Sequence, residues 1–211
     1  MYPPLYPHLI AGRKEAGCDE AGRGSLAGPV FAAAVILPED FHHPLLQDSK
    51  KMNEKQRVEV EEFIKKHALA IGIGRCSAQE IDKWNILQAS IKAMHRALDN
   101  LPFQPDFVLV DGNRFSTYLP RGKAPLPGNA IPHRCFVKGD ARFAAIAAAS
   151  VLAKNCRDRH MVKLDDKYPG YEWKSNKGYP TAAHRKALAE MGPCKEHRKS
   201  FSINNNYLCN L

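Results

Sequence analysis

A continuous run of apolar residues, VFAAAVIL, occupies residues 30–37 and is followed directly by a proline. A strand with one face in water alternates apolar and polar side chains, and this run has no polar side. It therefore predicts a strand that is buried within its sheet. Such a strand places the strongest constraint on the fold, because both faces of its sheet must be covered.

Other elements are predicted around this run from apolar periodicity and from residues that begin and end helices. The other predicted strands cover residues 13–19, 68–76, 107–110 and 134–138. Helices are predicted over residues 53–67, 77–98, 140–164 and 181–191, and Asn85 is expected to interrupt the second of them. Strands come first and helices then alternate with them, which indicates an α/β fold with a mixed sheet and helices on its faces.

Composition narrows the class of protein. No run of 18 apolar residues or signal peptide is present, so we expect no membrane span and a cytoplasmic protein whose six cysteines are reduced. The net charge is +9, and residues 151–211 hold 12 Lys and Arg against 6 Asp and Glu. A basic surface of this kind favours polyanions, of which nucleic acids are the commonest.

Four acidic residues lie where predicted elements end or begin. Asp19 and Glu20 follow the first strand, Asp111 closes a strand, and Asp140 precedes a helix. Singly they have simple explanations: a solvated strand end, an Asp-Gly turn and a helix N-cap. Gathered at one edge of a sheet they would repel one another, and a hard divalent cation such as Mg²⁺ or Mn²⁺ would remove that repulsion. Two such ions can support phosphodiester cleavage, so acids inside a basic protein indicate a nuclease.

Six motifs carry a resemblance to a known family. They are DEAGRGSLAGPV at 19–30, DSKKM at 48–52, LVDG at 109–112, VKGD at 137–140, AAASVLAKNCRDR at 147–159 and NKGYPTAAH at 176–184. In this order they closely resemble the motifs of bacterial type 2 ribonuclease H, or ribonuclease HII. The resemblance implies a ribonuclease H-like α/β fold, with a mixed central sheet flanked by helices. It also implies a catalytic domain over residues 1–164 and a small helical substrate-binding extension over residues 165–211.

The resemblance also implies an activity: a metal-dependent endoribonuclease that cleaves the RNA strand of RNA–DNA hybrids. It would incise 5′ of single ribonucleotides in duplex DNA, leaving 3′-hydroxyl and 5′-phosphate ends, as in ribonucleotide excision repair. It implies a monomer that uses two Mg²⁺ or Mn²⁺ ions. The implied catalytic and metal residues are Asp19, Glu20, Asp111 and Asp140. The implied substrate-binding residues are Gly22, Arg23, Gly24, Lys50, Lys51 and Tyr179, where the Gly-Arg-Gly triplet contacts the ribose 2′-hydroxyl and Tyr179 stacks on the next sugar.

Two alternatives remain open from the sequence. Type 3 ribonuclease H shares the fold, but it usually has Gly-Lys-Gly where this chain has Gly22-Arg23-Gly24. A non-catalytic nucleic-acid-binding protein would explain the charge but not the clustered acids. Among the other polar residues, we expect His184 to be a helix-face residue rather than a general base, and Arg157 and Asp158 to form an ion pair or to lie at the surface.

Overall fold

The computed structural model describes residues 5–47, 49–124, 126 and 128–201. The sheet contains β1 (Glu15–Ala21), β2 (Val30–Ile36), β3 (Ala70–Cys76), β4 (Phe107–Asp111) and β5 (His133–Phe136). The helices are α1 (Glu54–His67), α2 (Ala78–Asp99), α3 (Ala144–Lys167), α4 (Trp173–Asn176) and α5 (Ala182–Met191). Two short 3-10 helices, η1 (Ser49–Lys51) and η2 (Gly139–Ala141), complete the described elements.

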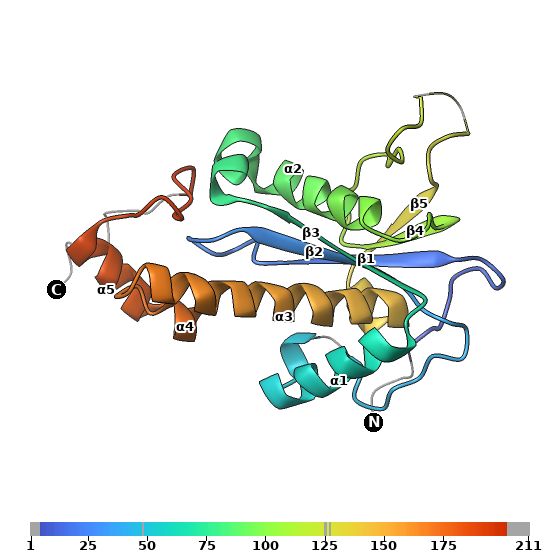
Figure 1. The fold of residues 1–211 in the computed structure, drawn as a ribbon, viewed down its shortest axis with the longest axis horizontal. Coiled ribbons are helices and arrows are strands. Elements are labelled where there is room, and N and C mark those ends of the chain that lie inside the picture. The colour runs from blue at the N-terminus through green and yellow to red at the C-terminus, as the bar shows by residue number, and fades with distance from the viewer. Residues whose placement is uncertain (1–4, 48, 125, 127, 202–211) are drawn as a thin grey trace.

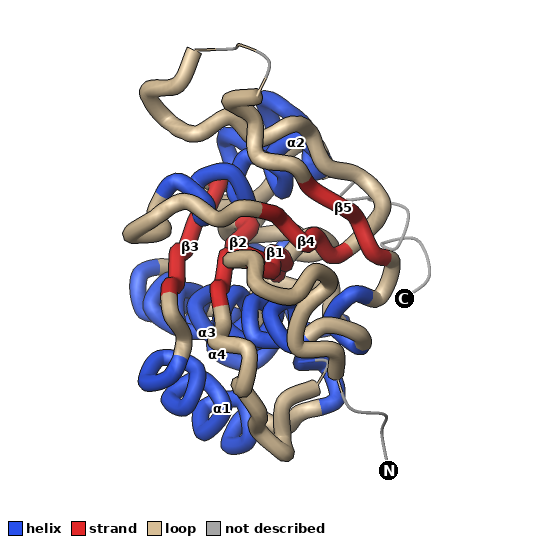
Figure 2. The backbone as a smooth tube through the Cα atoms, turned by 90° about the vertical axis from the view of Figure 1, so that its right-hand side faces the viewer, coloured by secondary structure: helices blue, strands red, loops and turns tan. Residues whose placement is uncertain are grey.

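The five strands form one sheet in the order β3-β2-β1-β4-β5 (Figures 1 and 2). β1 pairs antiparallel with β2 and parallel with β4, while β2–β3 is antiparallel and β4–β5 is parallel. The predicted mixed sheet is thus confirmed. All seven residues of β2 are buried, as the unbroken apolar run predicted.

Helices cover both faces of this sheet. α2 lies on one face, and α3 lies on the other with α1 beneath it (Figure 1). α3 approaches β1 very closely, because a Cβ atom at Gly17 would overlap the backbone of Ala145. The small residues of the α3 sequence and of β1 therefore let two backbones come into direct contact.

The C-terminal elements pack at one end of α3. α4 and α5 lie beside the last turns of that helix (Figure 1), around a hydrophobic cluster that includes Met161, Trp173 and Leu188. The same cluster contains Leu26 and Ala27 from the loop after β1. α3 itself continues through the boundary expected at residues 164 and 165, so the proposed extension shares a helix and a hydrophobic cluster with the rest of the chain.

Local expectations were confirmed at several positions and wrong at others. Ser77 and Glu80 form the predicted capping box, and Asn85 has non-helical angles inside α2 (φ 67°, ψ 165°). β1, however, continues through Ala21 instead of ending at residue 19, because its pairing with β2 extends to Phe31. Asp140 does not begin α3, since it lies in η2 and the helix starts four residues later.

Candidate functional site

Asp19 and Asp111 come from adjacent parallel strands. Cys18 is in register with Val110, so the next residue along each strand lies at the same edge of the sheet. The Gly139 N–H donates a hydrogen bond of 2.7 Å to Asp111 Oδ1. The turn before α3 is thereby fastened to the carboxylate at the end of β4.

Asp140 follows that bonded glycine directly and is 5% exposed. A Cβ at Gly139 would lie 2.7 Å from Ile146 Cδ1 and 3.3 Å from Asp111 Oδ1, so a larger residue would push the turn away from β4. The Asp140 side chain is therefore not the helix N-cap considered from the sequence. It is a buried carboxyl in a 3-10 turn, one residue from the group bound to Asp111.

The charges of these acids act on one another. Burial raises the pKa of Asp19 well above its usual range, and the charges of Glu20 and Asp111 raise it further. Burial also raises the pKa of Glu20, while the Arg23 guanidinium, 3.1 Å from Glu20 Oε1, opposes the shift. Within the described residues, no three or more Asp, Glu, His or Cys side chains are already assembled as a metal-binding group. The acids thus converge at one edge but do not form a closed cage.

Two hydroxyl groups connect Asp19 to the DSKKM segment. Ser150 of α3 donates to the Asp19 carboxylate, which lowers its pKa, and the Ser150 and Ser49 hydroxyls lie 2.9 Å apart. Ser49 begins η1, so η1 is held close to the acidic edge. Lys51 is exposed at the end of η1, and the side chain of Lys50 lies outside the described residues.

The two glycines of the Gly-Arg-Gly triplet have different surroundings. Gly22 has φ +97°, and a Cβ there would overlap the side chain of Arg157. Gly24 has no atom within 4 Å of its Cβ position. Gly22 is therefore required by the packing of the protein itself, whereas Gly24 leaves an open approach to the main chain. Arg23, between them, extends its guanidinium to Glu20.

Tyr179 lies beside this loop. Gly178 accepts a hydrogen bond of 2.8 Å from the Leu26 N–H, and Asn176 Oδ1 accepts one from the Gly178 N–H. The half-buried Tyr179 ring has the Arg157 guanidinium 5.2 Å from its centre. Segments about 150 residues apart in sequence are thus brought together.

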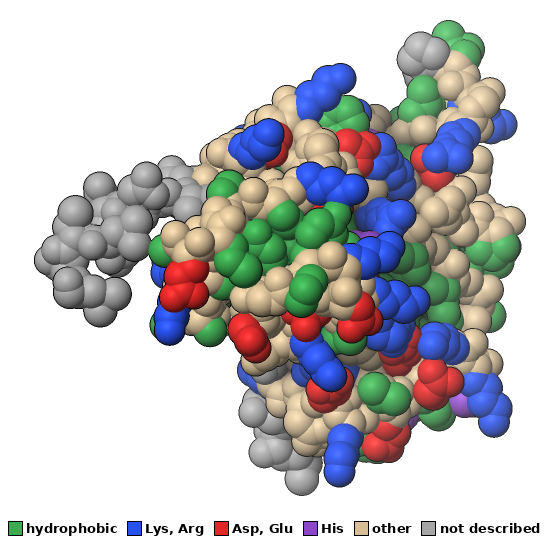
Figure 3. All heavy atoms as spheres, turned by 60° about the vertical axis from the view of Figure 1, so that its left-hand side comes forward, with side chains coloured by type: hydrophobic (Ala, Val, Ile, Leu, Met, Phe, Trp, Pro, Cys, Tyr) green, Lys and Arg blue, Asp and Glu red, His purple; other side chains and the backbone are tan. Residues whose placement is uncertain are grey.

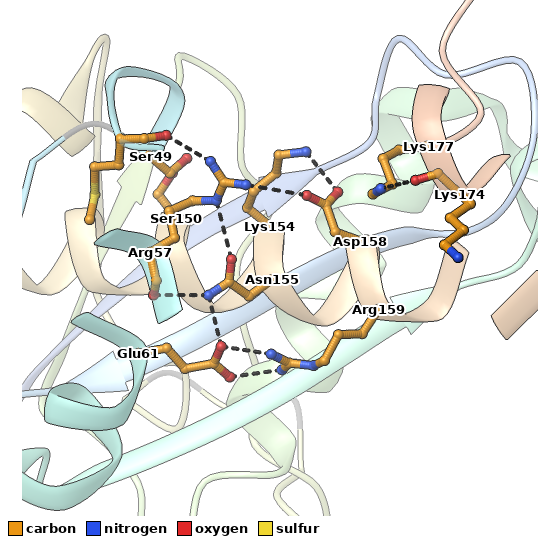
Figure 4. Close-up of polar contacts among 11 residues, drawn as sticks. Ser49, Arg57, Glu61, Ser150, Lys154, Asn155, Asp158, Arg159, Lys174 and Lys177 are labelled. Atoms are coloured by element: carbon orange, nitrogen blue, oxygen red, sulfur yellow. Dashed lines mark hydrogen bonds and ion pairs between the residues drawn. The ribbon is translucent and has the colours of Figure 1, made fainter. Parts of the chain in front are cut away.

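The α1–α3 interface carries a second polar network (Figure 4). Glu61 accepts two hydrogen bonds of 2.7 Å from Arg159 and a third from Asn155. Asp158 pairs with Lys154 and with Arg57. The expected pairing of Asp158 with Arg157 is wrong, because the two residues point in different directions from α3.

Sequence reasoning missed four buried polar residues near the site: Arg157, His184, His197 and Arg198. His184 was expected to be a helix-face residue and does lie in α5; it is completely buried there, and its Nδ1 lies 3.0 Å from the Tyr179 carbonyl oxygen. Charged and polar residues are mostly exposed in proteins, so their identity alone predicts a position at the surface. For Arg157, the one signal was Gly22, whose missing side chain leaves space for the guanidinium.

Comparison with known proteins identifies the family. The family model described as Ribonuclease HII matches residues 16–204. The chain is 53% identical to Ribonuclease HII of Porphyromonas gingivalis over 188 residues, covering 89% of each chain. It is 52% identical to Ribonuclease HII of Bacteroides thetaiotaomicron over 199 residues, covering 94% of each.

Solved structures agree in fold. Ribonuclease H2 from Pyrococcus horikoshii superposes with a TM-score of 0.70 at 24% identity, covering 90% of this chain and 94% of that one. A ribonuclease HIII bound to Mn²⁺ gives a TM-score of 0.63 at 16% identity, covering 95% of this chain but 71% of that one. The relatives that are about 50% identical in sequence are type 2 enzymes, whereas the type 3 enzyme is only 16% identical, so the chain is of type 2. The chain belongs to the ribonuclease HII family, and it is a metal-dependent endoribonuclease of ribonuclease H type 2.

Proposed function

We propose that the chain incises the 5′ side of a ribonucleotide, both in RNA–DNA hybrids and at a single ribonucleotide within duplex DNA. One observation carries this proposal: the Gly22–Gly24 loop continues directly from the strand that holds Asp19 and Glu20, and Gly178, the neighbour of Tyr179, is bonded to Leu26 just after that loop. Groups that can read a sugar therefore lie next to groups that can act on its phosphate.

The four acids Asp19, Glu20, Asp111 and Asp140 are proposed to hold two divalent ions, Mg²⁺ or Mn²⁺. Their donors are all oxygens, which suit these hard cations. When bound, the ions supply an activated water and stabilise the leaving oxygen. The chain contributes buried carboxylates that repel one another without a cation. It also contributes the Ser150 hydroxyl and the Gly139 N–H, which orient two of them.

The sugar is proposed to be read by the main chain of Gly22, Arg23 and Gly24. The open space at Gly24 allows a ribose to come within hydrogen-bond distance of the backbone. The 2′-hydroxyl is both donor and acceptor, and it distinguishes RNA from DNA. Tyr179 then packs against the following deoxyribose. Lys50 and Lys51 are proposed to contact the phosphate backbone.

Affinity for the duplex is proposed to come from basic side chains. A run of Lys and Arg side chains passes down the face of the molecule in Figure 3. In Figure 4 Lys174 and Lys177 lie near Asp158 of α3, and Lys177 Nζ donates a hydrogen bond to the Lys174 carbonyl oxygen. We propose residues 165–211 as a substrate-binding extension on this basis. The log of the affinity should fall with the log of salt concentration by about 0.9 per phosphate contact.

The cellular setting is proposed on chemical grounds. Five cysteines lie among the described residues and all are free, which suits the reducing cytoplasm. No helix in the described part of the chain is long and apolar enough to cross a membrane. We propose that the enzyme acts as a monomer on ribonucleotide-containing DNA in that compartment.

The test is a panel of duplexes with none, one, four or many ribonucleotides, assayed with Mg²⁺ and with Mn²⁺. We expect a single cut 5′ of the lone ribonucleotide and rejection of all-DNA duplex by about 10⁴–10⁵. Gly24→Val should lower cleavage of every ribonucleotide substrate without changing the melting temperature, because its side chain enters open space. Tyr179→Ala should lose activity mainly at RNA–DNA junctions. Comparable cutting of all-DNA duplex would refute the assignment of the triplet.

A further inference from the structure

The segment at residues 194–200 lies along the loop that follows β1. Ala27 and His197 form an antiparallel bridge. The Gly28 N–H donates to the Glu196 carbonyl at 2.8 Å, and the Arg198 N–H donates to the Leu26 carbonyl at 2.9 Å. The other end of the segment is attached to α2, where Asp82 accepts hydrogen bonds from the Lys199 and Ser200 N–H groups.

Arg198 extends from this segment beneath the Gly-Arg-Gly loop. It is completely buried, and it donates to the carbonyl oxygens of Arg23 and Gly28, both at 2.9 Å. The equally buried Arg157 of α3 supports the same loop at Ser25 Oγ and at the carbonyls of residues 27 and 29. Every hydrogen bond of these two guanidiniums to described residues goes to residues 23–29. The carbonyl of the central residue of the triplet is thus held from behind.

His197, the neighbouring residue, extends toward Tyr179 instead. Its Nδ1 accepts the Cys194 N–H at 3.0 Å, so the proton of the neutral ring is on Nε2 and is donated to His184 Nε2 at 3.1 Å. His184 Nε2 also accepts the Trp173 indole N–H, and its own proton is therefore on Nδ1. That Nδ1–H donates to the Tyr179 carbonyl at 3.0 Å. One tautomer of each ring is consistent with these contacts, and the Trp173 and His197 N–H groups then share the single lone pair of His184 Nε2.

Burying Arg157 and Arg198 costs free energy, so their role is unlike that of ordinary core residues that only fill the interior. Two guanidiniums buried near each other lose hydration and repel, and burial together with the Arg157 charge lowers the pKa of Arg198 to about 9. Arg157 Nη1 and Arg198 Nη2 find no hydrogen-bond partner among the described residues. Apolar side chains of similar volume would stabilise the interior more cheaply, so these arginines are better explained by the geometry they impose.

We infer that His197 and Arg198 are positioning residues, which fix the sugar-reading loop and Tyr179 at one separation, that of two successive sugars at an RNA–DNA junction. Arg198 holds the loop at Arg23 and Gly28. His197 holds Tyr179 through His184. The inference rests on the proposed roles of the triplet and of Tyr179. It adds that the C-terminal segment sets substrate choice through residues that do not touch the substrate.

The test uses the full-length variants R198K, H197F and their double mutant, with H197Q as a milder change that keeps a donor toward His184. An ammonium group cannot reach both carbonyls, so we expect R198K to lower kcat/KM on a single-ribonucleotide duplex by about 10-fold or more. The loss on a long hybrid should be several times smaller. R96K is the matched control, because Arg96 pairs with Glu80 on α2, away from the loop.

Coupling gives a second measurement. If His197 and Arg198 both act by setting the distance between the sugar-reading loop and Tyr179, the two substitutions should not be independent. The fold-loss of selectivity in the double mutant should then be smaller than the product of the two single losses. H197Q should keep more selectivity than H197F at equal melting temperature. Equal proportional losses on all substrates, or unchanged selectivity in both R198K and H197F, would overturn the inference. A different result would refute the proposed function: an unmodified enzyme that cleaves all-DNA duplex as well as ribonucleotide-containing duplex.

Discussion

Ser150→Ala tests how the acidic edge is prepared for a metal ion. The Ser150 hydroxyl donates to the Asp19 carboxylate and thereby lowers a pKa that burial, Glu20 and Asp111 all raise. A hydrogen bond to a charged group contributes about 1.5–3 kcal/mol. Its removal should raise the pKa of Asp19 further and leave less of the anionic form that a metal requires. We expect the apparent affinity for Mg²⁺ or Mn²⁺ to fall about 10- to 100-fold at neutral pH.

The measurement is a Mn²⁺ titration without substrate, by calorimetry or by electron paramagnetic resonance, followed by rates as a function of Mg²⁺ concentration. Ser90→Ala is the matched control. Ser90 is equally buried in a helix, but its hydroxyl has no hydrogen-bond partner among the described residues. The control should bind metal normally. An unchanged affinity in Ser150→Ala, with cleavage restored at no higher Mg²⁺, would refute the proposed role of the hydroxyl.

Three further changes have definite expected outcomes. Asp111→Asn should nearly abolish cleavage, while the melting temperature in chelator is unchanged or raised, because a charge that repels Asp19 is removed; a lower melting temperature would instead indicate a structural role. Hydrogen bonds from Arg159, Asn155 and Lys65 outweigh burial and lower the pKa of Glu61 from 4.5 to about 2. This shift corresponds to at most about 3 kcal/mol of unfolding free energy, and solvent screening at the half-exposed Arg159 reduces the contribution to about 1–2 kcal/mol. Glu61→Gln should therefore lower the melting temperature by about 3–8 °C, seen by calorimetry, with cleavage at 25 °C retained. His197 has a pKa lowered by burial to about 4, so the unfolded chain takes up its proton first as the pH falls. Unfolding free energy measured in urea should decrease from about pH 6.5 to pH 4, and less steeply in H197Q.

Local chemistry explains which parts of the fold were predictable. Asn85 was identified as an interruption of α2, because Asn is one of the few non-glycine residues that tolerate a positive φ. Asp140 was assigned to a helix start, since Asp is a good N-cap; the hydrogen bond that places it in a 3-10 turn comes from Asp111, which is distant in sequence. For Arg157 an ion pair or a surface position was expected, because its burial depends on the space left by Gly22, which is distant in sequence. Helices and strands can be predicted from residues that are close in sequence. The burial of a polar side chain depends on contacts between segments that are distant in sequence, so it could not be predicted.

α3 connects the two halves of the proposed site as a rigid spacer. Ser150 touches Asp19 and Arg157 supports the sugar-reading loop, and their separation of seven positions corresponds to about 10 Å of helix. One inserted residue would lengthen this spacing by about 1.5 Å and rotate Arg157 by about 100° away from the loop. Changes in chain length during evolution must therefore fall outside this stretch. In the loop between β4 and β5, Tyr118 is anchored in the core, but residues 122–124 are exposed, and it is there that a variant of this enzyme could gain or lose residues.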